Sequence, residues 1–356
     1  MEHFKPYYRL FERAAAVFFA FASLAVPPVH EAAAAAGLPE FSGASGTVFR
    51  REMESFSPEE YRAATAALFS AFEAKAGRRI SLGAKGKVGI KVYTNSGPGN
   101  ATPANLVRAV VMELEKRGYS RGDVCIVDMS RMKMRSCGFL PKYADLLKGV
   151  PDDFEGSPVV DIDSGSHFSP DWFYDNPLMP RGVKYALSFT PEENAEARKS
   201  YLPVPLFLTV DFWINLPTVT DMEGIGVCGA LGNATVWNMS NSERFLAAPA
   251  NAPVAVAEVA AIPELSESLL FSIMSFERAQ YVGGAIFNAG FTVSVRELLL
   301  SSDPVALDFI ALNLINRSRA ENGFDVIEPI PPVFDYARQL EIGDFDFSKI
   351  RMENAR

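Results

Sequence analysis

The segment "KVGIKVYTNSGPGNATPANLVRAVVMELEKRGYSRGDVCIVDM" (87–129) decides the fold class that the sequence predicts. Its apolar ends, at 87–93 and 123–129, have the length and composition of buried β-strands. Between them, a glycine-bearing loop leads into helical spacing over 102–118. Strand, loop, helix and strand within about 40 residues form a βαβ unit, in which the strands are parallel and the crossover is right-handed.

Two predicted helices carry clear boundary residues. In the helix over 102–118, Thr102 is the expected cap and Pro103 the expected first residue. The segment 57–77 begins with Ser57 in capping-box spacing, continues with apolar residues at helical intervals and ends in a glycine. Both segments are therefore expected to be helices.

Further apolar runs extend the predicted sheet. Strands are expected at 205–217 and 268–276, because both runs are apolar and bounded by residues that favour turns. The segment around 253–261 alternates with the period of a strand. Residues 295–323 contain the end of a strand, a turn and a long helix.

The remaining segments are less regular. Residues 131–205 are rich in Pro, Gly, Asp and Ser and are expected to form an irregular insertion with short helices. About 30 residues at the C-terminus are expected to lie across the surface. The sequence therefore predicts an α/β protein with a mainly parallel central sheet flanked by helices, as one domain over 37–356.

The composition excludes several classes of protein. The formal net charge is −9, which argues against nucleic acid as a partner. The chain has three cysteines (Cys125, Cys137 and Cys228), too few for an Fe–S cluster with four cysteine ligands. It also has three histidines, so we expect no His-rich metal centre. Neither a metal nor a cofactor is identified by the sequence, and the oligomeric state is open.

Residues 1–36 have the layout of a secretory signal. Basic residues precede the apolar run "AAAVFFAFASLAV" (14–26), and small residues follow at 32–34. The alternative is an amphipathic N-terminal helix that packs on the body of a cytoplasmic protein. The first interpretation implies export to the periplasm or envelope. A membrane partner is expected only if the segment is not cleaved, since the apolar run is shorter than the roughly 20 residues of a spanning helix.

The loop "YTNSGPGN" (93–100) is a candidate binding loop. Parallel sheets bind ligands outside the carboxyl ends of their strands, and the following helix offers free N–H groups to an anion. Asn95, Gly97 and Gly99 can turn the chain tightly and present backbone donors. A turn that needs these residues for its backbone conformation is the alternative.

Lys91 interrupts the apolar strand "VGIKVY". A lysine in a buried strand requires a partner or a solvated cleft, and Asp128, near the end of the next strand, is the candidate partner. An exposed strand edge is the alternative. Asp308 lies among apolar residues after Asp303, which is expected to cap a helix. A buried Asp308 requires a partner such as Lys91 or an arginine, and it is either a structural brace or a binding residue of the cleft.

The stretch "DFWINLPTVTDMEGIGVCGALGN" (211–233) combines an apolar strand, two acids and a glycine-rich segment. Asp221 can take part in proton transfer or metal binding. Glycines allow close approach of a ligand, whereas Cys228 is interpreted as a small buried side chain. The candidate binding residues of this stretch are Asn215, Gly226, Gly229 and Asn233.

These pieces resemble the bacterial and archaeal family called domain of unknown function 362. The resemblance covers 87–316 discontinuously and is most specific at "LLLSSDPVALDFIA". It implies an α/β fold but no general reaction. This chain departs from the family pattern at Thr220, Asp221 and Met222, where a lysine, a threonine and a histidine are usual, and at Gly232, where a lysine is usual. It also lacks the ferredoxin cysteines of some members.

Two hypotheses of function arise from the sequence. In the first, the protein is a small-molecule enzyme of unknown reaction, in which Lys91 orients an anionic group and Asp128 or Asp221 transfers protons or binds a metal. In the second, it is a non-catalytic protein that holds a metabolite or an envelope component in the same cleft.

Overall fold

The computed structural model describes residues 38–180 and 190–356. The contacts divide the chain into Met1–Ala33 and Ala34–Arg356, and all of the described residues belong to the second unit. The predicted signal segment, 1–36, lies outside the described residues. Among the residues that are described, no helix combines the length and apolar character needed to cross a membrane.

An eight-stranded sheet forms the centre of this unit, in the order β14-β1-β13-β10-β7-β2-β3-β4. Every neighbouring pair is parallel except the two that involve β13, which is antiparallel to β1 and β10. The predicted α/β class with a mainly parallel sheet is therefore confirmed. The strands are β1 (Thr47–Glu52), β2 (Val88–Val92), β3 (Val124–Asp128), β4 (Val159–Asp161), β7 (Phe212–Leu216), β10 (Leu269–Ser275), β13 (Glu297–Ser301) and β14 (Arg351–Asn354).

The predicted βαβ unit consists of β2, α3 (Ala104–Glu115) and β3. The cap prediction is wrong, because Pro103 is the N-cap and no side chain caps the helix. Thr102 ties the loop to the sheet instead. Its hydroxyl accepts a hydrogen bond from the Tyr93 N–H (2.8 Å) and donates one to the Leu216 carbonyl (2.6 Å).

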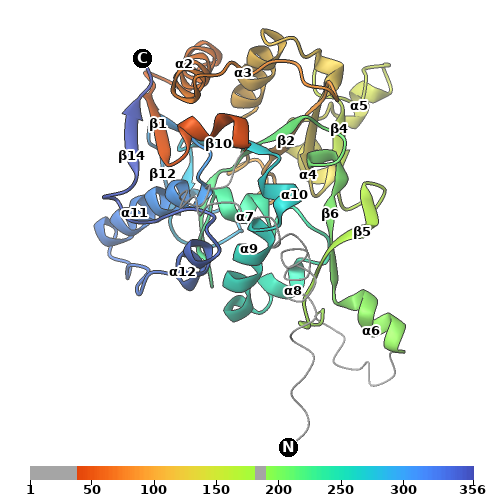
Figure 1. Ribbon diagram of the computed structural model, residues 1–356, viewed down its shortest axis with the longest axis vertical. Coiled ribbons are helices and arrows are strands. Elements are labelled where there is room, and N and C mark those ends of the chain that lie inside the picture. Colours follow the sequence, from red (N-terminus) through yellow and green to blue (C-terminus); the bar gives the residue numbers. More distant parts are fainter. Residues whose placement is uncertain (1–37, 181–189) are drawn as a thin grey trace, which may run out of the picture. The chain divides into compact units, whose positions relative to one another are not determined.

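Helices cover both faces of the sheet (Figure 1). On one face, α2 (Pro58–Ala76) and α3 pack on one row of alternating strand residues. On the other face lie α7 (Ala230–Ala234), α9 (Ala252–Ala260) and α11 (Pro304–Glu321). The predicted ends of α2 are confirmed, since Ser57 accepts the Glu60 N–H and Gly77 closes the helix at φ +67°.

Two central strands continue into a second, four-stranded sheet of order β12-β11-β8-β9. Its strands are β8 (Val219–Met222), β9 (Gly226–Cys228), β11 (Ala279–Gln280) and β12 (Thr292–Val293). β7 leads into β8, and β10 leads into β11, and the pairs β7–β10 and β8–β11 are both parallel. The chain that follows β7 and β10 therefore stays paired beyond the carboxyl edge of the large sheet.

Three segments differ from the sequence prediction. The strand predicted around 253–261 is wrong: α9 occupies this segment, because the run is apolar on almost every side and Pro253 fits the first helical turn. The C-terminal segment is not a surface tail: α12 (Pro332–Gln339) buries Phe334, and β14 pairs with β1. The predicted insertion, 131–205, contributes β4 to the large sheet.

The rest of that region, and the connections elsewhere, consist of short elements. β5 (Phe168–Asp175) and β6 (Lys199–Pro203) form a separate antiparallel pair. The short helices labelled in Figure 1 are α4 (Arg131–Ser136), α5 (Tyr143–Leu146), α6 (Pro191–Ala197), α8 (Glu243–Leu246) and α10 (Pro263–Ser266), in addition to α7.

We expect Phe334→Ala to lower the free energy of unfolding by about 3–5 kcal/mol, because it leaves a large cavity in a fully buried site. Tyr336→Ala, on the same helix and 38% exposed, is the control and should cost far less. Urea denaturation followed by tryptophan fluorescence measures both. Equal small losses would show that α12 contributes little to the core.

Candidate functional site

A row of polar residues crosses the centre of the large sheet. Lys91 on β2 is in register with Asn215 on β7, which is in register with Ser272 on β10. Residues aligned across neighbouring strands point to the same face. All three side chains are fully buried, so each of their polar groups requires a partner inside the protein.

Lys91 uses all three of its ammonium donors. Nζ donates to Asp128 Oδ1 (2.7 Å), to Asn233 Oδ1 (3.0 Å) and to the Val92 carbonyl (2.7 Å). The predicted pairing of Lys91 with Asp128 is confirmed, and the alternative of an exposed strand edge is wrong. Burial lowers the pKa of Lys91, and the ion pair with Asp128 opposes that shift.

The other amides extend this contact into a network. The Asn233 amide donates to Asn215 Oδ1 (2.8 Å), and the Asn215 amide donates to the Ala230 carbonyl (2.9 Å) and to Ser272 Oγ (3.1 Å). Thr94 donates to the second oxygen of Asp128. We call this set the Lys91 network; its members are Lys91, Thr94, Asp128, Asn215, Asn233 and Ser272.

Asp308 lies on α11 and holds the N-terminal end of α7. Its carboxylate accepts the backbone N–H groups of Ala230 (2.5 Å) and Leu231 (3.0 Å). Burial raises the pKa of Asp308 to about 8, and the two N–H groups oppose that shift. Asp303 caps α11, as predicted, by accepting the Ala306 N–H (2.9 Å).

The glycines of the stretch 211–233 are surrounded by the protein's own atoms. A Cβ at Gly229 would lie 2.2 Å from Asp308 Oδ1. Gly226 has φ +77°, and a Cβ there would lie 2.3 Å from the Pro331 ring. The space beside these two predicted ligand-binding residues is therefore occupied by Asp308 and Pro331.

Asp221 does not join the Lys91 network. It lies on β8 of the second sheet, where Oδ1 accepts the Gly284 N–H (2.9 Å) and Oδ2 lies 3.5 Å from Arg319 Nη1. Burial raises the pKa of Asp221, which the Gly284 N–H and Arg319 oppose. Of the three predicted catalytic residues, the structure thus brings together Lys91 and Asp128.

The loop 93–100 is a braced turn. Gly97 has φ +72° and donates its N–H to the Thr94 carbonyl (2.9 Å), which fits the turn interpretation. A Cβ at Gly99 would clash with the Phe287 ring. Asn95 differs from the two glycines, because its side chain accepts a hydrogen bond from Lys133 and lines a cavity.

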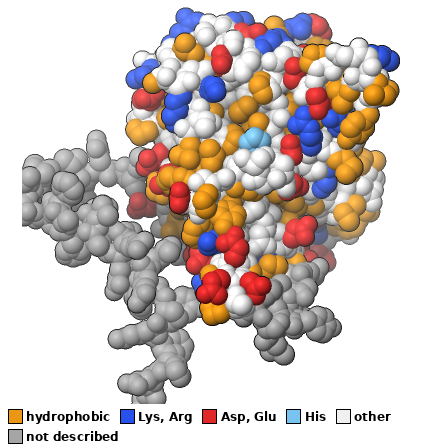
Figure 2. Space-filling model, turned by 90° about the vertical axis from the view of Figure 1, so that its right-hand side faces the viewer, with side chains coloured by type: hydrophobic (Ala, Val, Ile, Leu, Met, Phe, Trp, Pro, Cys, Tyr) orange, Lys and Arg blue, Asp and Glu red, His pale blue; other side chains and the backbone are white. Residues whose placement is uncertain are grey.

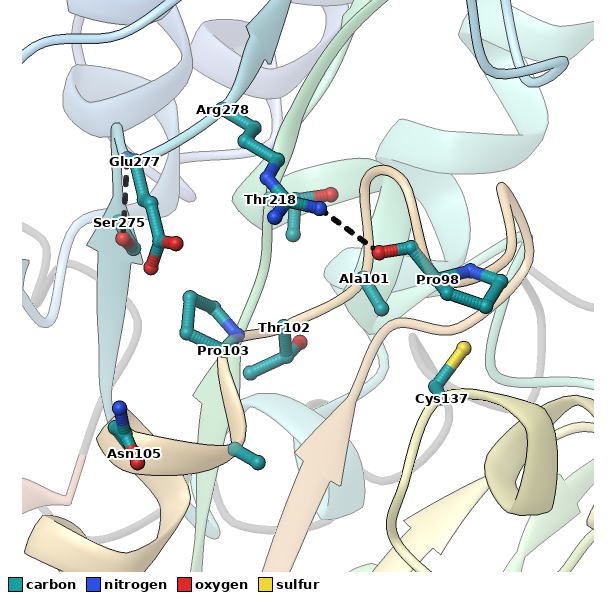
Figure 3. Close-up of a pocket in the computed structure, with 11 residues that line it drawn as sticks. Pro98, Ala101, Thr102, Pro103, Asn105, Cys137, Thr218, Ser275, Glu277 and Arg278 are labelled. Atoms are coloured by element: carbon teal, nitrogen blue, oxygen red, sulfur yellow. Dashed lines mark hydrogen bonds between the residues drawn. The ribbon is translucent and has the colours of Figure 1, made fainter. Parts of the chain in front are cut away.

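A first cavity of about 210 Å³ lies where the carboxyl ends of β2, β7 and β10 approach the start of α3. Figure 3 shows Glu277 beside Ser275 on one side and Cys137 on the other. Arg278 extends across it and donates to the carbonyls of Pro98 (2.9 Å) and Gly99 (2.8 Å). The Arg278 guanidinium is thus already hydrogen-bonded to the backbone that lines the cavity.

A second cavity, of about 610 Å³, opens at the carboxyl ends of β2, β3 and β4, and we call it the carboxyl-edge cleft. Asn95 follows β2, Ser130 follows β3 and Asp163 follows β4. Its other walls are Lys133 of α4 and the segment 237–247 around α8. The cavity therefore lies where the sequence predicts a cleft, at the carboxyl ends of the strands.

Trp237 connects the carboxyl-edge cleft with the buried interior. Trp237 lines the cleft, and its indole N–H donates to Cys228 Sγ (3.0 Å). Its ring packs edge-on against Tyr93, with the two ring centroids 6.2 Å apart. Burial raises the pKa of Cys228 far above its usual range, which fits an inert thiol. The indole therefore joins the wall of the cleft to the buried residues Cys228 and Tyr93.

The segment 237–247 was missed by the sequence analysis. It contributes Trp237, Asn241, Glu243 and Arg244 to the carboxyl-edge cleft. The signal that could have found it is the mixture of an aromatic residue, amides and charges directly after the glycine-rich stretch. In the described part of the chain, no group of three or more His, Cys, Asp or Glu residues is placed to hold a metal ion.

The surface of the unit carries charges of both signs. On the face shown in Figure 2, acidic and basic side chains alternate with hydrophobic ones. A ligand that approaches this face therefore meets mixed chemistry rather than a field of one sign.

Comparisons with known proteins give a structural neighbour and no family. No family model and no curated protein matches the chain. The chain is similar to a Thermotoga maritima protein solved by a structural genomics consortium, with 12% identity and a TM-score of 0.37. The match covers 77% of this chain and spans 60% of the length of that protein. The resemblance to domain of unknown function 362 stays a prediction.

We expect Lys91→Met to lower the free energy of unfolding by about 3–5 kcal/mol, because it leaves the Asp128 carboxylate buried without its cation. Lys133→Met removes an exposed lysine from the same edge and should change stability by about 0.5 kcal/mol or less. Chemical denaturation measures both. If Lys91→Met lowered the free energy of unfolding by less than about 1 kcal/mol, the Lys91–Asp128 pair would not be the major contribution to stability that we expect.

The raised pKa of Asp308 predicts a pH dependence of stability. The folded pKa of about 8 lies above the ordinary value of about 3.9, so the folded protein binds a proton at Asp308 more tightly than the unfolded chain does. The stability that this proton contributes is complete below about pH 4 and is lost as pH rises through about 8. We expect the free energy of unfolding to fall over this range by at most about 1.4 kcal/mol per pH unit for this group. Denaturation at several pH values should show a smaller fall in Asp308→Asn and an unchanged fall in the exposed control Asp335→Asn.

Proposed function

We propose that the protein binds a small polar molecule in the carboxyl-edge cleft. The observation that carries the proposal is a cavity of about 610 Å³ at the carboxyl ends of three parallel strands that lie side by side. Ligands of open α/β sheets bind at this edge. The volume also falls within the range of about 300–1,000 Å³ typical of small-molecule sites.

The lining of the carboxyl-edge cleft fits a polar ligand. Asn95 offers its amide NH2 group, since its oxygen accepts from Lys133, and Ser130 offers a hydroxyl. Asn241 offers its amide oxygen, since its NH2 group donates to two backbone carbonyls. Trp237 supplies an apolar ring on which a flat or aliphatic part of a ligand can pack. This combination of one aromatic surface and several polar groups is common in sites that orient a small molecule.

Binding without turnover is favoured over catalysis by the state of Lys91. An acid–base group has to reach the substrate, directly or through a water molecule. Lys91 is 0% exposed, and each of its donors already has an acceptor within the protein. The Lys91 network therefore supports a structural role beside the cleft.

A small-molecule enzyme is the second candidate. The observation that favours it is the position of the Lys91–Asp128 pair, since Thr94 contacts Asp128 and the next residue, Asn95, lines the carboxyl-edge cleft. A shift of the loop would bring substrate close to this pair. In that case Asp128 would be the proton carrier and Lys91 the group that orients an anion.

We expect the protein purified from its own host to retain a small molecule, detected by native mass spectrometry. Ala247→Trp should abolish retention, because the indole fills the carboxyl-edge cleft. Ala101→Trp, which fills the cavity beside α3, is the matched control and should retain the molecule. Circular dichroism and thermal unfolding confirm that both variants fold.

The outcomes separate the hypotheses. Loss in Ala101→Trp alone would move the ligand to the cavity beside α3, and absence of any bound molecule would contradict the proposal. A ligand recovered unchanged after incubation supports a binding protein. Conversion to a product that Asp128→Asn abolishes would support the enzyme instead.

Export and family membership are further proposals that rest on the sequence. The basic, apolar and small-residue layout of 1–36 supports export, and the motifs from 87 to 316 support the resemblance to domain of unknown function 362. The N-terminus of the mature protein, read from the same sample, tests export. A chain that begins after 32–34 supports it, and a chain that begins at Met1 contradicts it.

A further inference from the structure

Arg244 is a buried cation at the wall of the carboxyl-edge cleft. It is 2% exposed and lines the cavity. Among the described residues it forms no ion pair with a carboxylate, and its Nε has no hydrogen-bond acceptor. A buried charge without a counter-ion is costly, which singles this residue out.

The hydrogen bonds of Arg244 all go to neutral groups. Nη1 donates to the carbonyls of Asn176 (2.9 Å) and Leu178 (2.6 Å), and Nη2 donates to Ser200 Oγ (2.9 Å). These bonds tie α8 to the β5–β6 pair. They explain an arginine as a structural link, but they leave its charge unbalanced and its Nε unpaired.

One acid that acts electrostatically on Arg244 already has a partner. Asp175 contributes to the electrostatic surroundings of Arg244 but pairs with Arg198, at 3.0 Å. Burial lowers the pKa of Arg244, as expected for a cation that lacks a close carboxylate. An anionic group in the cleft would supply the missing counter-charge.

In the part of the chain that the structure describes, two carboxylates of the carboxyl-edge cleft lack a cationic partner, just as Arg244 lacks an anionic one. Asp163 and Glu243 line it, and within the described residues neither side chain forms a hydrogen bond or an ion pair. Burial raises the pKa of Asp163, and the neighbouring acids Asp128, Asp161 and Glu243 raise it further against the effect of Lys133. A cationic group near Asp163 would relieve this repulsion.

We propose that the ligand of the carboxyl-edge cleft is an amino-acid-like zwitterion. Its carboxylate pairs with Arg244, and its ammonium group lies near Asp163 and Glu243. A guanidinium recognises a carboxylate through directed, charge-assisted hydrogen bonds, and a carboxylate pair recognises an ammonium. This inference rests on the proposed binding function and specifies its ligand class. Free amino acids and short peptides share the chemistry.

The first experiment compares matched probes on the wild-type protein. Isothermal titration calorimetry measures the standard α-amino acids, glycine-containing dipeptides, the corresponding amides and the N-acetylated forms. At least one amino acid or dipeptide should bind about tenfold or more tightly than its amide and its N-acetylated form, because each derivative removes one charge. Preference for a dipeptide over its constituent amino acids would assign the ligand to short peptides.

Variants then locate the two charges. Arg244→Lys keeps the cation but loses the planar donors, and it should weaken binding of the zwitterion about tenfold while leaving binding of the amide unchanged. Arg62→Met, which removes an exposed arginine of α2, is the control and should not change affinity. Asp163→Asn with Glu243→Gln should remove the preference for the free ammonium group.

Three results would overturn the inference. These are equal binding of acid and amide, absence of binding by every zwitterion at millimolar concentration, and an unchanged acid preference in a folded Arg244→Lys variant. If a neutral molecule such as a polyol is retained from the host and is lost in Ala247→Trp, the proposed binding function stands and the zwitterion inference fails. If nothing is retained and no probe binds, both fail.

Discussion

The structure depends on the neutralisation of one lysine inside the sheet. Lys91 lies in the first strand of the βαβ unit, is fully buried, and directs its ammonium group to Asp128, Asn233 and a backbone carbonyl. A buried cation of this kind is stable only while every partner stays in place. The register of β2, β3 and β7, and the position of the short helix α7, are therefore linked through one set of hydrogen bonds.

The same constraint explains the glycine-rich stretch. α7 has to approach the sheet closely enough for Asn233 to reach Lys91, and α11 has to approach α7 closely enough for Asp308 to accept two backbone N–H groups. Gly229 leaves room for Asp308, since a Cβ would lie 2.2 Å from its carboxylate. Gly229 thus serves the approach of α11 to α7, and the ligand site that we propose lies in the carboxyl-edge cleft instead.

This arrangement relates stability to function. The polar row on the sheet is closed to solvent, whereas the cleft next to it keeps carboxylates and a guanidinium without partners of opposite charge among the described residues. Trp237 lines the cleft and packs against the buried residues Cys228 and Tyr93. A fully satisfied interior provides rigidity, and the unsatisfied groups at the edge provide the recognition surface of the proposed binding protein.

The sequence by itself determined the α/β class, the βαβ unit, the ends of α2, the cap at Asp303 and the pairing of Lys91 with Asp128, because periodicity, caps and the cost of a buried charge act locally. The tertiary structure decided that 253–261 is a helix, that the C-terminal segment joins the core, and that Asp221 lies in a second sheet away from Lys91. It also decided that Arg244 and Asp163 line one cleft. Such juxtapositions depend on how strands continue from sheet to sheet and on which distant segments pack together, and no local pattern encodes either.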